Sequence, residues 1–314
     1  MKNMDSLKSI VLSVIPRILG LLDRNPDSKT YGCFDRYYWH YKLIDFPNIR
    51  FQEASLILSL IYKNESFGRY FHSINIKSFA EAAICFAFSK QNSDGSFNEM
   101  YPFERSFVAT SFAGWALTES IMMLNLNGWE SNIIKLGDWL SENDNIDVSN
   151  QMAGAANALY NISFLTKDKK YLEASNNKIN KLFEQKENEL FLSEYGGADI
   201  GYLSIALSHL ANLWKKTKCD LVLKISDDAG TFIDNNLNED GRFDWDKMSR
   251  KTQYVYPNGF AILKRHSVLN KLSKGLSQNL ILNPLWMDDR FCIPFTLDYL
   301  MAFQELYGDK SKQE

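Results

Sequence analysis

The chain has 314 residues, of which 45% are hydrophobic and 14% aromatic, and its net charge is −3. This composition suffices for a sizeable hydrophobic core, and it excludes the general attraction to nucleic acid that a strongly basic chain would have. The four cysteines lie far apart and form no C-x-x-C pair, which predicts buried free thiols and argues against a zinc site or a disulfide framework. They are Cys33, Cys85, Cys219 and Cys292.

Helical periodicity runs along the chain, and the alternation typical of strands is nearly absent. The longest uncharged apolar run, Ser106 to Thr118, is shorter than the roughly 18 residues that a membrane span needs, so we expect a core helix there. Ser9 to Leu22 is interrupted by Arg17 and precedes no small-residue cleavage site, which argues against a signal peptide. We therefore expect a cytoplasmic protein without a transmembrane segment. Helices are predicted at 5–23, 49–63, 72–91, 106–124, 130–142, 149–165, 168–186, 198–216, 219–236, 253–268, 272–281 and 291–307.

A turn pattern recurs between the predicted helices. Short polar residues and glycine in it suit the backbone angles of a turn, and the next helix begins seven to ten residues after a phenylalanine. We interpret the pattern as a repeated junction in which the phenylalanine packs between helix ends. Its copies are Gln91-x-x-Asp94-Gly95-x-Phe97, Gln185-x-x-Asn188-Glu189-x-Phe191 and Asp240-Gly241-x-Phe243, with a shorter echo in Gly32-x-Phe34.

The predicted helices alternate in character. Those at 106–124, 149–165 and 198–216 are apolar nearly all round and rich in Ala, Ser and Gly, whereas their successors carry Lys, Glu and Asp on one face. A buried inner layer and an amphipathic outer layer explain both patterns. No linker rich in Pro, Gly or Ser divides the chain. We therefore predict an all-α protein with one domain over residues 1–314, an (α/α)6 toroid of about twelve helices in an inner and an outer ring.

The Q-x-x-D-G-S-F turns followed by small-residue helices resemble the repeats of α/α-toroid proteins. These include terpenoid cyclases, protein prenyltransferase β-subunits, and the toroidal domains of heparinase-like polysaccharide lyases and uronyl epimerases. The Asp-rich motif of the cyclases is missing here, and neither the zinc ligands of the prenyltransferases nor the Cys-His signature of lanthionine cyclases can be matched. The resemblance therefore implies a carbohydrate-active protein without a metal or other cofactor. The large β-sandwich that accompanies heparinase-like toroids is also missing, which puts depolymerisation in doubt.

In such a fold, every loop from an outer helix to the next inner helix emerges at the same end of the molecule. These loops are predicted at 24–48, 91–105, 142–149, 186–197, 236–252 and 281–291. Seven of the ten arginines lie in or beside them, although the chain otherwise prefers lysine. The planar guanidinium matches carboxylate and phosphate groups. The arginines either brace the loops by pairing with nearby Asp and Glu, or some of them bind an anionic ligand.

The candidate site residues come from the same loops. Tyr31 to Glu53 is the densest aromatic segment, and aromatic faces beside polar groups suit sugar rings. Gly196 and Gly197 permit a tight turn, which we expect to expose Glu194 and Tyr195, while Asp199 equally suits a helix cap. We predict catalytic roles for Tyr195, Glu194, Asp94, His40 and Tyr38. We predict substrate-binding roles for Arg36, Arg50, Arg105, Glu104, Gln151, Asp199, Tyr202, Arg250, Tyr254 and Arg290.

These residues favour an enzyme that acts on an acidic glycan or an anionic sugar conjugate by lyase- or epimerase-type proton abstraction. Such chemistry needs a group that neutralises the substrate carboxylate, a base and a proton donor. One alternative is a glycoside hydrolase that pairs Asp94 or Glu104 with Glu194. Others are a terpenoid-cyclase-like protein and a non-catalytic binding or assembly protein of surface-polysaccharide biosynthesis. The binding protein predicts that arginines neutralise every carboxylate of the site. The sequence leaves the oligomeric state open.

Overall fold

The computed structural model describes residues 5–186 and 191–308. Over these residues the chain folds into α-helices and short 3-10 helices, and its β-structure is limited to isolated bridges. The all-α prediction is therefore confirmed.

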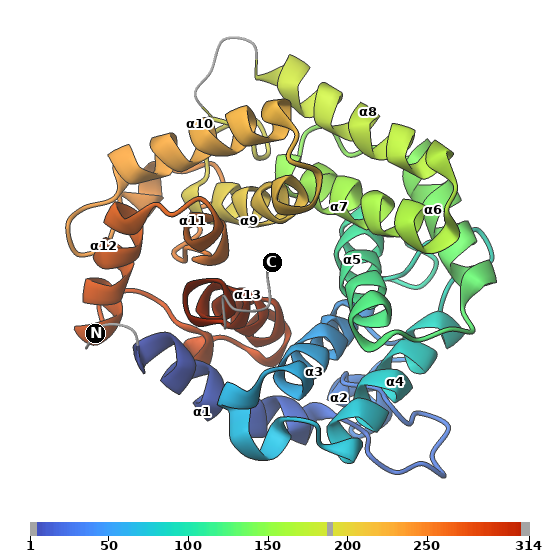
Figure 1. Cartoon of the computed structure of the whole chain (residues 1–314). Coiled ribbons are helices and arrows are strands. Elements are labelled where there is room, and N and C mark those ends of the chain that lie inside the picture. The colour runs from blue at the N-terminus through green and yellow to red at the C-terminus, as the bar shows by residue number, and fades with distance from the viewer. Residues whose placement is uncertain (1–4, 187–190, 309–314) are drawn as a thin grey trace.

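Six inner helices surround a central axis (Figure 1). Each packs against the next, and the last packs against the first, so that the ring is closed. They are α3 (Ala54–Lys63), α5 (Phe107–Leu124), α7 (Ser149–Thr166), α9 (Ile200–Thr217), α11 (Asn258–Ile262) and α13 (Asp289–Tyr307).

Six outer helices lie around this ring, and each precedes an inner helix in the chain (Figure 1). They are α1 (Asp5–Leu21), α4 (Ile74–Ser89), α6 (Glu130–Glu142), α8 (Lys169–Gln185), α10 (Asp220–Asn236) and α12 (His266–Ser277). Short elements decorate the connections: α2 (Arg36–Trp39), η1 (Ile49–Glu53), η2 (Glu65–Tyr70), η3 (Trp245–Lys247) and η4 (Pro284–Trp286).

The predicted difference between the two layers is confirmed by burial. Helix α5 is buried on nearly every face, whereas α8 buries one stripe that includes Tyr171, Ser175 and Ile179, four residues apart. Helix α5 is also long and apolar enough to span a membrane, but 72% of it is buried inside the protein, as expected of a core helix. No other helix among residues 5–186 and 191–308 passes that test.

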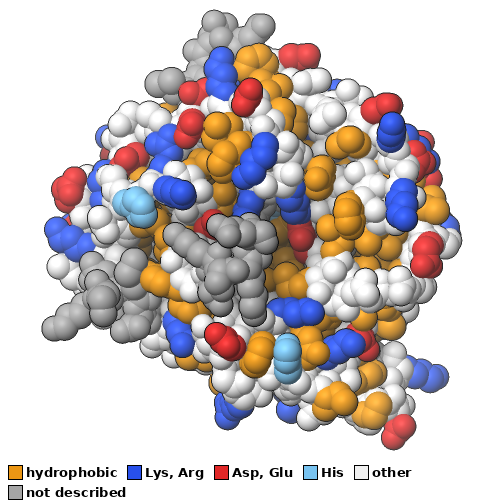
Figure 2. Space-filling model, viewed as in Figure 1, with side chains coloured by type: hydrophobic (Ala, Val, Ile, Leu, Met, Phe, Trp, Pro, Cys, Tyr) orange, Lys and Arg blue, Asp and Glu red, His pale blue; other side chains and the backbone are white. Residues whose placement is uncertain are grey.

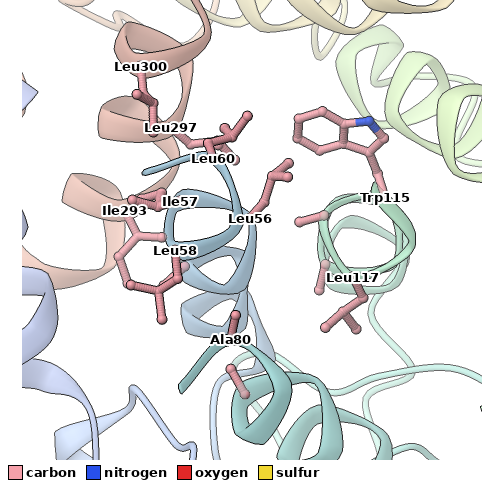
Figure 3. Close-up of a cluster of buried hydrophobic side chains, with 14 of the residues drawn as sticks. Leu56, Ile57, Leu58, Leu60, Ala80, Trp115, Leu117, Ile293, Leu297 and Leu300 are labelled. Carbon is pink, nitrogen blue, oxygen red and sulfur yellow. The ribbon is translucent and has the colours of Figure 1, made fainter. Parts of the chain in front are cut away.

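The core where α3, α5 and α13 meet is shown in Figure 3. Leu56 and Ile57 of α3 lie between Trp115 of α5 and the Ile293 side of α13, and these side chains are at most 4% exposed. Burying one such leucine or isoleucine side chain contributes roughly 1.5–3 kcal/mol to the free energy of unfolding.

The repeated turns pack against the outer helices. Gly32, Gly95 and Gly241 all have positive φ, of 91°, 100° and 77°. A Cβ on Gly95 would lie 2.1 Å from the carbonyl oxygen of Lys135 in α6, and one on Gly32 would lie 2.2 Å from a carbonyl oxygen in α4. Only glycine permits both the backbone angle and this close approach. The copy with Asn188 and Glu189 lies outside the described residues.

The prediction was wrong in two places. A helix was expected at 253–268 and the next at 272–281, but residues 251–257 are not helical, α11 covers only Asn258–Ile262, and α12 begins at His266. Pro257 explains the first difference, because proline disfavours helical angles in the residue before it, and Lys264, with φ of 55°, separates the two helices. All four cysteines are free as expected, but Cys85 and Cys219 are exposed rather than buried.

Candidate functional site

The segments that precede the inner helices contact one another at one end of the ring. We call this end the loop face; its segments are 22–53, 90–106, 143–148, 191–199, 237–257 and 278–288. Their mutual contacts include a hydrogen bond from the Ile49 N–H to the Asn98 carbonyl, a β-bridge between Val148 and Glu194, and a hydrogen bond from the Ser249 N–H to the Ala198 carbonyl. The loops that were predicted to share an end therefore do so.

Arg50 lies at the centre of this end. Asn48 caps η1 by accepting a hydrogen bond from the Arg50 N–H at 3.0 Å, which fixes the backbone from which the side chain extends. The Arg50 Nε donates to Glu53 at 2.6 Å, and the guanidinium lies 4.7 Å from the Phe112 ring centroid. The terminal nitrogens of Arg50 have no hydrogen-bond partner in the described part of the chain, and the side chain is 11% exposed.

A second arginine, Arg290 at the start of α13, pairs with the buried carboxylate of Glu99. Its Nε is buried and has no partner within residues 5–186 and 191–308. Burial, followed by the charge of Arg50, lowers the pKa of Arg290 to about 10. Two guanidinium groups are thus held close together, each with hydrogen-bonding capacity that the described residues do not use.

A third arginine, Arg250, lies 4.3 Å above the ring of Tyr195, whose ring is 5.9 Å from that of Tyr202. Burial and Tyr202 raise the pKa of Tyr195, and the positive charges of Arg250 and Arg50 oppose that rise. Both arginines are therefore close to this tyrosine. The Arg250 guanidinium is exposed, and no described residue pairs with it.

Two further tyrosines complete the group. Tyr254 and Tyr256 lie with ring centroids 5.7 Å apart. Burial raises the pKa of both hydroxyl groups well above 10, and the charge of Arg50 again opposes the rise. We use the name arginine cluster for Arg50, Arg250 and Arg290 together with Tyr195, Tyr202, Tyr254 and Tyr256. Six of its seven members, all except Tyr256, were predicted site residues; they come from four different junctions between an outer and an inner helix, and the fold brings them together.

Glu194 does not have the environment that was predicted. It was expected to be exposed by the glycine turn, but it is fully buried. Its carboxylate accepts hydrogen bonds from the Asn150 backbone N–H at 2.8 Å and the Asn150 Nδ2 at 2.6 Å. Burial raises its pKa well above 4.5. The side chain holds the start of α7 against the next loop, which is a structural role.

The side chains of Asp199 and Gln151 also form hydrogen bonds within the protein. Asp199 caps α9 by accepting from the Tyr202 N–H, and it accepts from the Arg250 N–H and the Thr252 hydroxyl as well. Gln151 accepts a hydrogen bond from Asn145 Nδ2 at 2.9 Å. The helix-cap interpretation of Asp199 is therefore confirmed.

The loop before α5 is braced internally. Asp94 accepts from the N–H and hydroxyl of Ser96, and it pairs with Arg105 at 2.9 Å. The carboxylate of Glu104 accepts hydrogen bonds from three successive backbone N–H groups, of residues 99–101. Ser96 and Arg105 hold the pKa of Asp94 below 3.8 against the effect of desolvation. Arg242 similarly pairs with Asp240 on segment 237–257. In this segment and in the loop before α5, the interpretation that arginines brace carboxylates is correct.

Three predicted residues on α2 and beside it lie apart from the arginine cluster. Arg36 lies 4.9 Å from the Tyr41 ring, the Tyr38 hydroxyl accepts from Lys90, and the exposed His40 ring packs between two aromatic rings. No hydrogen bond, ion pair or ring contact within the described residues joins them to the cluster.

A small cavity of about 30 Å³, lined by both polar and apolar side chains, lies on the ring axis at the arginine cluster. Arg50, Glu53 and Tyr256 form one side of it, and His209 and Asp298 form another. His209 stacks on Phe112 with centroids 4.9 Å apart, and burial, followed by the charge of Arg50, lowers its pKa to about 3. The imidazole is therefore neutral at physiological pH.

Sequence reasoning missed Glu53, Glu99, His209 and Asp298. The spacing of Arg50 and Glu53, which are three residues apart in a helical segment, was the one available signal for an ion pair. His209 and Asp298 lie within helices, where a polar residue gives no sign of whether it faces the axis, and Glu99 lies in the loop before α5, where nothing in the sequence sets it apart from the other polar residues. A cavity of about 1400 Å³ opens at the opposite end of the ring and was not predicted.

No group of three or more His, Cys, Asp or Glu side chains within residues 5–186 and 191–308 is placed to hold a metal ion. Comparison with protein-family models and with curated proteins finds no match to this chain. The functional argument therefore depends on the geometry of the loop face.

Proposed function

We propose that this protein binds an anionic sugar, such as a uronic acid or a sugar phosphate, at the arginine cluster. The observation that carries the proposal is the unused hydrogen-bonding capacity of three neighbouring guanidinium groups. The Arg250 guanidinium, which lies over the Tyr195 ring, has no hydrogen-bond or ion-pair partner among the described residues, and Arg50 and Arg290 each keep at least one nitrogen without a hydrogen bond. Guanidinium groups left in this state suit a carboxylate or phosphate that accepts two hydrogen bonds at once.

The aromatic side chains of the loop face support a sugar as the ligand. Of the eight exposed aromatic side chains in the described part of the chain, seven lie on the segments of this face. They come from five of its six segments. Sugar rings have apolar faces that pack on aromatic rings and polar edges that bind to charged groups. The seven are Tyr37, Tyr41, Tyr101, Phe103, Tyr195, Trp245 and Trp286.

Charge neutralisation favours binding over proton abstraction. Glu53 and Glu99 are paired with arginines, and Glu194 is enclosed by Asn150. Burial raises the pKa of Tyr195, Tyr254 and Tyr256, so these hydroxyl groups stay protonated at neutral pH and are not available as bases. The binding alternative predicted carboxylates neutralised by arginines; Glu53 and Glu99 agree with it, whereas Glu194 is held by Asn150 instead. The pairing of Glu194 with Asp94 or Glu104 that a glycoside hydrolase would need is disfavoured, since Glu194 is fully buried.

Calorimetric titration tests the proposal. The wild type should bind uronic-acid oligosaccharides or sugar phosphates more tightly than the corresponding neutral sugars, and added salt should weaken the binding. Arg250→Ala should reduce the affinity about tenfold or more, because one charge-assisted contact is worth roughly 1.5–3 kcal/mol. Arg242→Ala is the matched control, because Arg242 lies on the same segment but pairs with Asp240.

Two results would contradict the proposal. Equal affinity for charged and neutral sugars would remove the role of the arginines, and equal losses in the two variants would remove the role of the cluster. The same mixtures should be followed by NMR spectroscopy. Formation of an unsaturated or epimerised uronate would favour the lyase or epimerase alternative instead.

A further inference from the structure

The small cavity of about 30 Å³ adjoins the arginine cluster on the ring axis. Trp115 and Met301 line both this cavity and the large one, so these two side chains stand between them. The large cavity opens at the end of the ring that Figure 2 shows, where the surface is hollowed near its centre. Arg50, in contrast, belongs both to the arginine cluster and to the wall of the small cavity. A sugar held by this guanidinium therefore lies next to the small cavity, and what we infer for the cavity rests on the proposed function.

The His209 side chain lines the small cavity without a hydrogen bond. It is 7% exposed and stacks on Phe112. Its Nδ1 atom is buried and unpaired, and Nε2 has no partner either among residues 5–186 and 191–308. Because this imidazole is neutral at physiological pH, it has one N–H donor and one free acceptor nitrogen. Native proteins pair nearly all such buried groups, so an unpaired imidazole beside a cavity indicates a hydrogen-bonding group of a ligand.

Two further polar side chains of the wall have unused hydrogen-bonding capacity. The terminal nitrogens of Arg50 donate no hydrogen bond within the described residues, and Glu53 uses only one carboxylate oxygen, for the Arg50 Nε. Asp298 differs, because its two oxygens accept from the Ser208 hydroxyl and the Asn258 N–H. The wall therefore offers both free donors and free acceptors.

The charges of the wall disfavour an anion inside the cavity. The guanidinium of Arg50 lines it together with the carboxyl groups of Glu53 and Asp298. The net charge of the wall is therefore zero when Asp298 is protonated and negative when it is ionised, and the neutral His209 adds nothing. A hydroxyl group can accept a hydrogen bond from a guanidinium while it donates one to a carboxylate or an imidazole nitrogen. It matches this wall better than a carboxylate or a phosphate does.

The volume of about 30 Å³ also limits the group that can enter. It has room for about one or two water molecules, and so for a hydroxyl or hydroxymethyl group but not for a sugar ring. We propose that the small cavity receives one hydroxyl group of the bound anionic sugar and that His209 selects for it. The anionic group of the same sugar stays outside the cavity at Arg250 and Arg290. The hydroxyl group accepts a hydrogen bond from Arg50 and donates one to the imidazole of His209.

Two small molecules that differ in charge test the cavity without a sugar. The ring ¹⁵N resonances of His209 report occupancy in NMR spectra of the wild type, because this side chain lines the cavity. Methanol should shift them saturably, whereas sodium formate should have no more effect than sodium chloride at the same ionic strength. The other three histidines, His40, His72 and His266, are internal controls because they lie outside this cavity. The proposal is overturned if methanol gives no saturable shift, as expected of a cavity that holds a tightly bound water only, or if formate shifts His209 as much as methanol does.

Calorimetric titration tests the same assignment with the sugar. Glucuronate and glucose 1-phosphate should each be compared with their monodeoxy analogues. Removal of one particular hydroxyl group should weaken binding to the wild type about thirtyfold or more, because polar groups of the site are then left unpaired. His209→Phe, which keeps an aromatic ring against Phe112, should reduce this discrimination to about threefold or less. His40→Phe is the matched control and should keep the full discrimination, since His40 packs between aromatic rings outside the cavity.

Equal discrimination by His209→Phe and the wild type would overturn the proposal, and so would similar losses for every hydroxyl group removed. If circular dichroism shows that His209→Phe does not fold, the methanol and formate titrations of the wild type decide alone. Failure of the wild type to bind any anionic sugar would refute the proposed function instead. The two small molecules would still show whether the cavity accepts a hydroxyl group, so the two failures can be told apart.

Discussion

Replacing Asp298 with asparagine should flatten the pH dependence of stability. Asp298 lies in the middle of α13 and is 2% exposed. Its carboxylate accepts hydrogen bonds from the Ser208 hydroxyl of α9 and, at 2.7 Å, from the Asn258 N–H at the start of α11. It therefore joins three inner helices. Burial outweighs these hydrogen bonds and raises its pKa from 3.8 to about 7.

The direction in which stability changes with pH follows from where the proton binds more tightly. Because the pKa is higher in the folded protein, the native state binds the proton more tightly than the unfolded state does between pH 3.8 and about 7. The free energy of unfolding that this group contributes is greatest at acidic pH and decreases as pH rises to about 7. At 1.36 kcal/mol per pH unit the whole decrease is about 4 kcal/mol, of which roughly 2.5 kcal/mol falls between pH 5 and pH 8.

The pH dependence of wild-type stability does not isolate the effect of Asp298, because the titration of His209 changes the free energy of unfolding in the opposite direction. Its pKa is lowered from 6.5 to about 3, so its contribution is complete above pH 6.5 and is lost as pH falls. The difference between Asp298→Asn and wild type removes this shared effect. The free energy of unfolding of each protein should be measured by urea denaturation at pH 5 and pH 8. The difference between the variant and wild type should shift in favour of the variant by roughly 2.5 kcal/mol from pH 5 to pH 8. Parallel curves for the two proteins would refute the reasoning.

Three further predictions concern the turns and the loop face. Gly95→Ala should lower the free energy of unfolding by about 2–4 kcal/mol, because it combines φ of 100° with a backbone clash. Gly128→Ala is the control, since Gly128 has φ of 110° but a Cβ there would meet no atom within 4 Å. It should cost only about 1–2 kcal/mol in the same denaturation experiment. Glu194→Ala should cost about 2–4 kcal/mol, because a buried backbone N–H loses its acceptor, whereas a change below about 0.5 kcal/mol would contradict the structural role. Phe103→Ser should weaken sugar binding in calorimetry about threefold or more while stability stays within about 0.5 kcal/mol, since the ring is 86% exposed; Phe164→Ser, 65% exposed but outside the loop face, should leave binding unchanged.

The fold was predictable mainly where one interaction dominates. Long helices such as α5 and α8 follow from apolar periodicity, because burial of one face decides their structure. The turns at Gly32 and Gly95 were recognisable because the backbone requires glycine there. The segment before Pro257 was not predicted correctly, since its aromatic and β-branched residues fit either a helix or an extended chain, and the position of the proline decided between them.

The candidate site was predictable only in part. Arg50, Arg250 and Arg290 could be assigned to one end because the order of the helices determines where their loops emerge. The environment of each carboxylate could not be assigned in this way. Glu194 and Glu104 look alike in the sequence, but one is enclosed by Asn150 and the other by backbone N–H groups on an exposed loop. Such differences depend on side-chain contacts between segments that are far apart in the chain.

The direction of the inner helices explains why the two ends of the ring differ. Each inner helix begins at the loop face, so the partial positive charges of the helix N-termini gather there and the partial negative charges gather at the opposite end. An anion at the arginine cluster is therefore favoured by both the helix dipoles and the guanidinium groups.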